Sequence, residues 1–129
     1  MKVCELYITK TKYTTETMKE FAKTILLKEN PELIAAYRHY HDHIWPEVVH
    51  SFRQVGVLDI KIWIIGRRLF MLMTTTNEFN PATDFEKYLS LHPKNKEWED
   101  LMATFQEKAP EAKPDEHWAD MELIFQMPA

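Results

Sequence analysis

The 129-residue sequence predicts an α+β domain with a ferredoxin-like split β-α-β fold, in which a four-stranded antiparallel sheet carries helices on one face. Apolar patterns follow the order strand, two helices, two strands, two helices, strand, which doubles a β-α-β unit. The length and the 45% hydrophobic content suit one domain with a sizeable core. The second face of the sheet needs a cover, so we expect a homodimer packed sheet to sheet, a dimeric α/β barrel.

The amino-terminal residues carry the weakest pattern. Alternation over residues 3–9 fits a short strand, and the polar, threonine-rich stretch that follows is typical of a connector. We therefore interpret residues 1–19 as an N-terminal extension of a single domain over residues 20–129. The first central strand of that domain is expected at residues 21–28.

Asparagine and proline mark the start of the first helix. Asn30 can accept hydrogen bonds from the first backbone amides, and Pro31 suits the first helical position. This helix should end near Trp45, because Pro46 cannot continue it. A second short helix should then run from Pro46 to a stop at Gly56. The remaining elements are expected as strands over 57–65 and 69–75, helices over 84–91 and 94–107, and a last strand over 117–127.

Composition excludes several classes of function. A net charge of −4, a pI near 5.9 and the lack of a basic block argue against a nucleic-acid partner. No apolar run is long enough to cross a membrane and no secretory leader is evident, so we expect a cytoplasmic protein without a membrane partner. Cys4 is the single cysteine, which excludes an intrachain disulfide and a cysteine-based metal site. Two glycines provide no phosphate-binding loop, and no motif indicates a cofactor.

The segment 37–47 carries the clearest chemical signal. Histidine changes its charge nearest neutral pH, and Tyr37 lies one helical turn before His41, so a hydroxyl and an imidazole share one helix face. This pair suits proton transfer on a small hydroxylated ligand, although His41 is equally explained as a core-edge histidine bonded to a backbone carbonyl. His39, His41 and His43 are an alternative metal site, but residues two apart on a helix point to different faces. His39 and His43 are better explained as solvated or capping residues.

Tryptophans provide candidate sugar-binding surface. Trp63, Trp98 and Trp118 fall on a strand, a helix and the start of the last strand. Aromatic rings pack on the C–H faces of sugars, but each tryptophan taken singly is better explained as a core residue. The carboxylates of the last two helices are expected on solvated faces; they are Asp84, Glu86, Glu97, Glu99 and Asp100.

The pattern Tyr37-x3-His41-x2-Ile44-Trp45-Pro46-Glu47, together with Asn30-Pro31 and the helix containing Trp98, resembles the L-rhamnose mutarotase family from about residue 21 to the end. The resemblance implies a small dimeric ferredoxin-like enzyme that interconverts sugar anomers without a cofactor. It also implies that His41 is the proton donor and that Tyr37 and Trp98 contact the sugar.

Two positions depart from the family pattern. Glu97 stands where the first member of a tryptophan pair is expected, and Ile60 stands where a substrate-contacting tyrosine is expected. Both departures bear on the preferred sugar more than on the reaction. Trp63, on the same strand as Ile60, is a candidate to replace part of the lost surface.

We therefore predict an isomerase, a mutarotase that interconverts the α and β anomers of L-rhamnose or a related deoxy sugar by acid–base ring opening, with a monosaccharide as its substrate. The missing aromatics favour an alternative, a dimeric module of the same fold that binds a small ligand without turnover. A third hypothesis, an oxygenase of this fold, rests on fold analogy alone.

Overall fold

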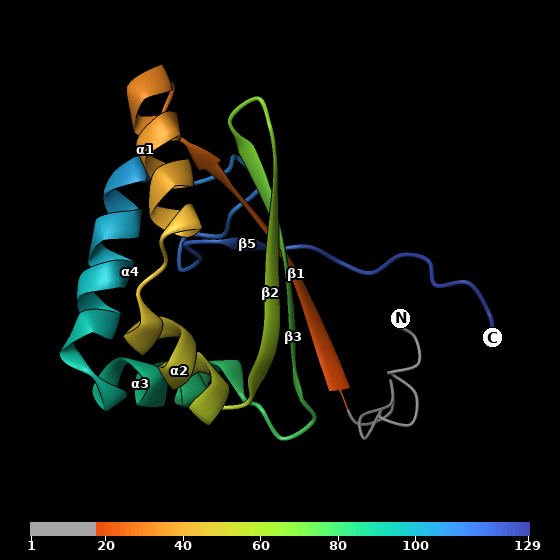
Figure 1. The fold of residues 1–129 in the computed structure, drawn as a ribbon. Coiled ribbons are helices and arrows are strands. Elements are labelled where there is room, and N and C mark those ends of the chain that lie inside the picture. Colours follow the sequence, from red (N-terminus) through yellow and green to blue (C-terminus); the bar gives the residue numbers. More distant parts are fainter. Residues whose placement is uncertain (1–17) are drawn as a thin grey trace, which may run out of the picture.

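The computed structural model describes residues 18–129, so the strand expected over residues 3–9 lies outside the described residues. Within this range the helices all cover the same face of one sheet (Figure 1). None of these helices is long and apolar enough to cross a membrane. In chain order the elements are β1 (Met18–Leu27), α1 (Pro31–Asp42), α2 (Pro46–Gln54), β2 (Val57–Ile65), β3 (Arg68–Thr76), α3 (Pro81–Leu91), α4 (Pro93–Phe105), β4 (Gln106–Glu107) and β5 (Ala119–Asp120).

The sheet has the antiparallel ferredoxin-like arrangement that the sequence predicts. Its strand order is β2-β3-β1-β4, and β5 also pairs with β1. All four pairings are antiparallel. Because β3 occupies one edge of β1 along most of its length, β4 and β5 share the other edge. The expected α+β class is confirmed.

The pleat of the sheet decides which side chains meet the helices. Ile60 of β2 lies opposite Met73 of β3, and both pack against the core beneath the helices. Trp63 lies opposite Phe70, and their rings stack at 5.3 Å between centroids. Since successive strand residues point to opposite faces, Trp63 and Phe70 belong to the face away from the helices.

Every helix in residues 18–129 begins at a proline. Asn30 caps α1 as expected, and Asn80 caps α3 in the same way by accepting from two backbone amides. The helices expected over 84–91 and 94–107 therefore begin earlier than predicted, at the prolines of Pro81–Leu91 and Pro93–Phe105.

The first helix ends earlier than the sequence predicts. It stops at Asp42, and Trp45 is extended, with ψ near 129°. A residue before a proline is sterically pushed out of the helical region, which explains this bend. The bend separates α1 from α2 and lets both helices lie against the sheet.

The expected last strand over 117–127 is wrong for most of its length. Only Ala119–Asp120 pairs with β1, followed by one hydrogen bond from the Met121 amide to the Ala22 carbonyl at 2.8 Å. Residues 121–129 then leave the sheet on the side away from the helices (Figure 1). An alternating apolar pattern favours an extended chain, but a ladder also needs a partner strand.

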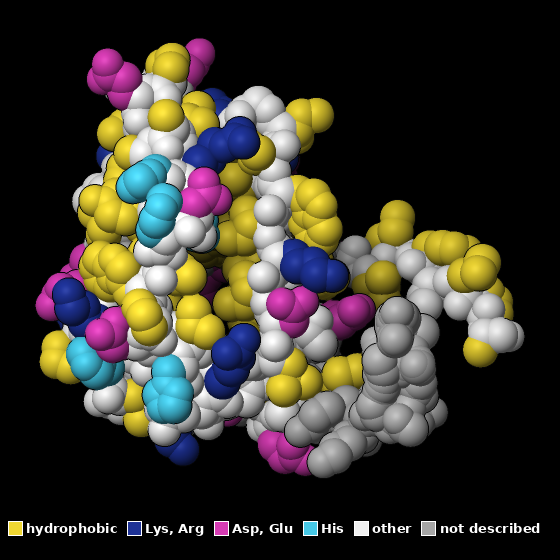
Figure 2. All heavy atoms as spheres, in the orientation of Figure 1, with side chains coloured by type: hydrophobic (Ala, Val, Ile, Leu, Met, Phe, Trp, Pro, Cys, Tyr) yellow, Lys and Arg dark blue, Asp and Glu magenta, His cyan; other side chains and the backbone are white. Residues whose placement is uncertain are grey.

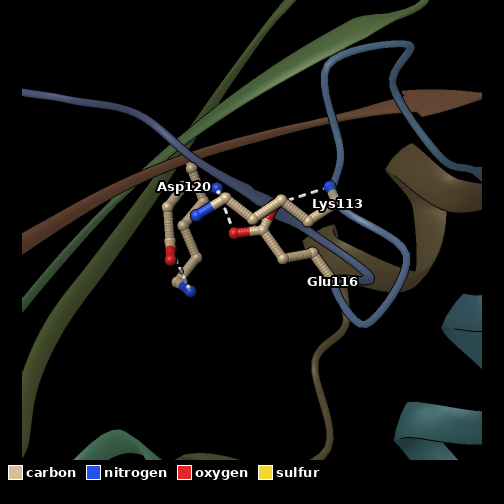
Figure 3. A network of polar contacts seen from close by, with 4 residues as sticks. Lys113, Glu116 and Asp120 are labelled. Atoms are coloured by element: carbon tan, nitrogen blue, oxygen red, sulfur yellow. Dashed lines mark hydrogen bonds and ion pairs between the residues drawn. The ribbon is translucent and has the colours of Figure 1, made fainter.

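A polar network holds the segment before β5 in place (Figure 3). The Glu116 carboxylate accepts hydrogen bonds from the backbone amides of Lys113 at 2.9 Å and Asp120 at 3.3 Å. Lys23 of β1 forms an ion pair with Asp120 at 2.7 Å, and this pairing lowers the pKa of the Asp120 carboxyl. The network therefore anchors His117 beside the sheet, at the edge where the functional residues gather.

Candidate active site

A cleft of about 1070 Å³ lies between the helices and the sheet. Figure 2 shows hydrophobic side chains lining the hollow between these two layers. Ile60, Ile62 and Met73 contribute to its sheet side. Polar groups reach the same cleft from several elements, and they include Tyr37, His41, Glu99, Gln106 and His117 beside further charged residues such as Asp42, Asp59 and Asp84. An apolar cleft with a few converging polar groups is the usual form of a small-ligand site.

His41 has one ring nitrogen committed and the other available. Its Nδ1 lies 2.9 Å from the Tyr37 carbonyl oxygen, one turn earlier on α1. A carbonyl only accepts, so Nδ1 carries a hydrogen, and Nε2 is the nitrogen that gains or loses a proton. Burial lowers the pKa of His41, which makes its imidazolium a stronger acid. His41 is therefore both bonded to a backbone carbonyl and suited to proton transfer. The backbone bond sets the tautomer that proton transfer needs.

Tyr37 presents a hydroxyl hydrogen to the cleft. The residue is 4% exposed, and its oxygen accepts a hydrogen bond from Gln106 Nε2 at 3.2 Å. His117 Nε2 in turn donates to Gln106 Oε1 at 2.7 Å. Burial raises the pKa of Tyr37 to about 12, so its hydroxyl stays protonated at neutral pH. With its oxygen occupied as an acceptor, Tyr37 remains a donor for a ligand.

The structure brings Trp98 together with His41. The two rings meet edge to face at 5.3 Å, and Trp45 contacts the other side of Trp98 at 5.2 Å. Trp98 lines the cleft but is only 4% exposed, so its main contact there is with the imidazole. This packing fixes the ring orientation of His41.

Trp63 does not join this group. It is one of the residues that line the cleft, yet it is 50% exposed and stacks on Phe70 on the outer face of the sheet. Trp118 also lines the cleft, and it packs against the core. The predicted cluster therefore reduces to Tyr37, His41 and Trp98.

Glu99 is the residue that the sequence interpretation placed wrongly. It was expected on a solvated face, but it is partly buried, lines the cleft and accepts a hydrogen bond from the Tyr88 hydroxyl at 3.0 Å. Burial raises the pKa of the Glu99 carboxyl to about 7. The helical spacing indicates this burial, because Glu99 follows the buried Asn95 by four residues and precedes the buried Met102 by three. Glu97, by contrast, is exposed.

The alternative histidine metal site is not assembled in residues 18–129. His39 and His43 lie exposed with their rings 4.4 Å apart, whereas His41 turns into the cleft. No group of three or more histidine, cysteine or acidic side chains in this part of the chain has a metal-binding arrangement. The helix therefore separates the three histidines as their spacing predicts.

The chain is therefore a small ferredoxin-like protein in which helix α1 places the His41 imidazole and the Tyr37 phenol beside an apolar cleft. The family model described as L-rhamnose mutarotase matches residues 20–127, and the chain belongs to that family.

Among curated relatives, the chain is 37% identical to a UPF0734 protein of Dictyostelium discoideum, over 84% of this chain and 90% of the relative. It is 34% identical to an L-fucose mutarotase of Xanthomonas campestris, over 84% and 88% of the two chains. It is 32% identical to an L-rhamnose mutarotase of Brucella anthropi, over 79% and 92%.

Solved structures support the fold. An L-rhamnose mutarotase from Formosa agariphila superposes with a TM-score of 0.60 at 23% identity, over 85% of this chain and 99% of that one. The tetracenomycin F2 cyclase of Streptomyces glaucescens, a polyketide cyclase, superposes with a TM-score of 0.55 at 14% identity, over 86% and 98%. One fold therefore carries more than one chemistry, and the function has to be argued from the site.

Proposed function

We propose that the protein is a mutarotase that interconverts the α and β anomers of a 6-deoxyhexose such as L-rhamnose or L-fucose. The observation that carries the proposal is the fixed tautomer of His41, whose Nδ1 bond to the Tyr37 carbonyl leaves Nε2 to exchange a proton in the cleft. The names of two relatives, an L-fucose and an L-rhamnose mutarotase, support this substrate class.

Mutarotation needs one acid and one base. During ring opening the anomeric hydroxyl loses its proton, the carbonyl forms, and the bond from the anomeric carbon to the ring oxygen breaks as that oxygen gains a proton. His41 in its imidazolium form donates from Nε2 to the ring oxygen. After the aldehyde rotates, closure on its other face returns the proton to Nε2. The lowered pKa of His41 favours the donating step.

The other cleft residues bind and orient the sugar. Tyr37 donates a hydrogen bond to a neighbouring hydroxyl, since Gln106 already occupies its acceptor side. Trp98 holds the imidazole and offers its cleft edge to the sugar. Ile60 and Met73 supply an apolar surface for the methyl group of a 6-deoxy sugar. The sugar contact predicted for Trp63 stays a prediction, because Trp63 stacks on Phe70 on the outer face of the sheet.

The proposal is tested by proton NMR saturation transfer between the two anomeric signals of L-rhamnose and of L-fucose, with and without the protein. We expect protein-dependent exchange for at least one of these sugars, and the same protein after unfolding is the control. If neither sugar nor a panel of common aldoses exchanges, the mutarotase proposal is wrong. Ligand-dependent stabilisation without exchange would then favour the binding module.

We further propose that the functional unit is a homodimer joined at the face of the sheet away from the helices. Trp63 and Phe70 stack on that face, and Ile65 beside them is 80% exposed. The segment 121–129 leaves the body on the same side (Figure 1). Its Leu123 and Phe125 are 74% and 73% exposed. Apolar surface of this extent marks a protein interface more often than a solvated face.

A further inference from the structure

Ring opening leaves one role unassigned in the cleft. When His41 protonates the ring oxygen, a second group has to take the proton of the anomeric hydroxyl. Tyr37 cannot serve as this base, because its pKa of about 12 keeps it protonated and Gln106 occupies its oxygen. His117 donates to Gln106 through Nε2, and no hydrogen bond within the described residues fixes its Nδ1 toward the cleft. Among the carboxylates of the cleft, Asp84 and Glu116 accept hydrogen bonds from backbone amides and Glu99 is partly buried without such a bond, whereas the others are exposed; these are Asp42, Asp59, Asp115 and Asp120.

Glu99 has the geometry for this role. It lies on α4 directly after Trp98, whose ring contacts His41, and its carboxylate acts electrostatically on Tyr37. Its helix, α4, packs beside α1, which carries Tyr37 and His41. Glu99 and His41 line the same cleft.

One carboxyl oxygen of Glu99 accepts a hydrogen bond from a neighbouring residue, and the other does not. The Tyr88 hydroxyl donates to Oε2 at 3.0 Å, and no residue of the described range donates to Oε1. Tyr88 is itself fixed: it is fully buried, its ring stacks on Phe52 at 3.9 Å, and its backbone carbonyl accepts from Asn95 Nδ2 at 2.8 Å. Tyr88 therefore orients the carboxylate while one oxygen stays available to a sugar hydroxyl.

We infer that Glu99 is the second proton-transfer residue of the site, the base that takes the proton of the anomeric hydroxyl while His41 protonates the ring oxygen; this inference rests on the proposed mutarotase function. In ring opening the O–H bond of the anomeric hydroxyl breaks and its proton moves to Glu99 Oε1. The electron pair of that bond forms the carbonyl, and the electron pair of the broken C–O bond takes the proton from His41 Nε2. Closure on the other face reverses both transfers, so neither residue is consumed.

The pKa shifts place the shared proton mainly on Glu99, so the reactive form, with the proton on His41, is the minor form of the singly protonated pair. Burial makes the Glu99 carboxylate a stronger base, with a pKa raised to about 7, and makes the His41 imidazolium a stronger acid. Three ionisable groups interact with Glu99: Tyr88 on α3, Asp100 on α4 and Tyr37 on α1. Among the further ionisable residues that line the same cleft are His41 on α1, Arg53 on α2 and Lys23 on β1.

This assignment predicts a bell-shaped pH profile of kcat/KM. The active form carries a proton on His41 and none on Glu99, so the pair holds one proton in total. The rate should fall above about pH 7, where the pair loses its proton, and fall again at low pH, where both members hold one. Without Glu99, kcat/KM should fall only once, as pH rises through the lowered pKa of His41.

The test compares Glu99→Gln with Glu97→Gln by saturation transfer over a range of pH. In E99Q the amide oxygen can still accept from the Tyr88 hydroxyl but the side chain cannot take a proton, whereas Glu97 is an exposed carboxylate on the same helix. We expect E99Q to lower kcat by about 10²–10⁴-fold with KM changed by less than about threefold, and to abolish the acid limb. E97Q should match wild type.

The outcomes separate this inference from the proposed function. Exchange by the wild-type protein, with E99Q equal to E97Q in rate and pH profile, overturns the role of Glu99 and leaves the mutarotase function standing. A large rise in KM with unchanged kcat and an unchanged profile also overturns it, because Glu99 would then only bind the sugar. No exchange by the wild-type protein at any pH overturns both proposals.

Discussion

His41 and His43 make the same backbone contact and lie in different environments. Each turns Nδ1 back to the carbonyl oxygen four residues earlier, His41 to Tyr37 at 2.9 Å and His43 to His39 at 3.0 Å. His41 is partly buried in the cleft, whereas His43 is exposed at the end of α1. The two residues therefore share a tautomer and differ in access to a ligand, which makes His43 a matched control for His41.

Replacing Tyr37 with Phe removes the hydroxyl that we place on the sugar. We expect KM to rise about tenfold, which corresponds to the loss of one hydrogen bond. The protein should lose only about 1 kcal/mol of stability, because Gln106 keeps its bond to His117. Tyr40→Phe on the same helix is the control, and saturation transfer with varied sugar gives KM. Equal KM values for the two variants would remove Tyr37 from the binding site.

The buried carboxyl of Glu99 should make stability depend on pH. Its pKa is about 7 in the folded protein against 4.5 in the unfolded chain, so the folded state holds the proton more tightly between these values. Stability is thus highest below pH 4.5 and is lost as pH rises to about 7. Relative to wild type, Glu99→Gln should gain up to about 3 kcal/mol between pH 5 and pH 8, measured by urea unfolding. Parallel stability curves for the two proteins would contradict the burial of this charge.

The two glycines offer a matched test of the backbone. Gly56, at the end of α2, has φ of +101°, and a Cβ there would lie 2.8 Å from Thr76 Oγ1. Gly66, in the hairpin between β2 and β3, has φ of +59° with open space around it. We expect Gly56→Ala to cost at least about 2 kcal/mol of stability and Gly66→Ala about 1 kcal/mol. Thermal unfolding gives both values, and the opposite ranking would be inconsistent with this turn geometry.

Removal of residues 123–129 should weaken the proposed dimer. The deletion keeps the Met121 amide bond to Ala22 and removes the exposed apolar side chains beyond it. Light scattering coupled to size-exclusion chromatography should give a dimer for the whole chain and a monomer for the shortened one at the same concentration. A whole chain that elutes as a monomer at high micromolar concentration would remove the dimer from the account.

The order of the elements could be predicted because local signals set it. Asn30 and Pro31 start α1 as expected, and the same Asn-Pro pair at residues 80 and 81 starts α3. That second signal is present in the sequence, although the helix there was predicted only from residue 84. Alternation predicted β2 and β3 correctly, since both pair along their length. The prediction of a final strand over 117–127 was wrong because an alternating pattern does not show whether a partner strand is present.

The site was predictable only where its residues lie on one helix. Tyr37 and His41 are four residues apart, so helical geometry alone brings them together. Gln106 bonds to Tyr37 from about 70 residues away and His117 bonds to Gln106, and no local pattern shows these contacts. Glu99 was missed for a different reason: its charge suggested a solvated face although its spacing placed it on the buried stripe of α4.

The most direct test of the central claim compares His41→Ala with His43→Ala by saturation transfer on L-rhamnose and L-fucose. The account predicts that H41A lowers kcat by about 10²–10⁴-fold, the range for a positioned acid–base group, and that H43A retains the wild-type rate. Urea unfolding of both variants shows that each still folds. Equal exchange rates for H41A and the wild-type protein would contradict the assignment of His41 as the proton-transfer residue.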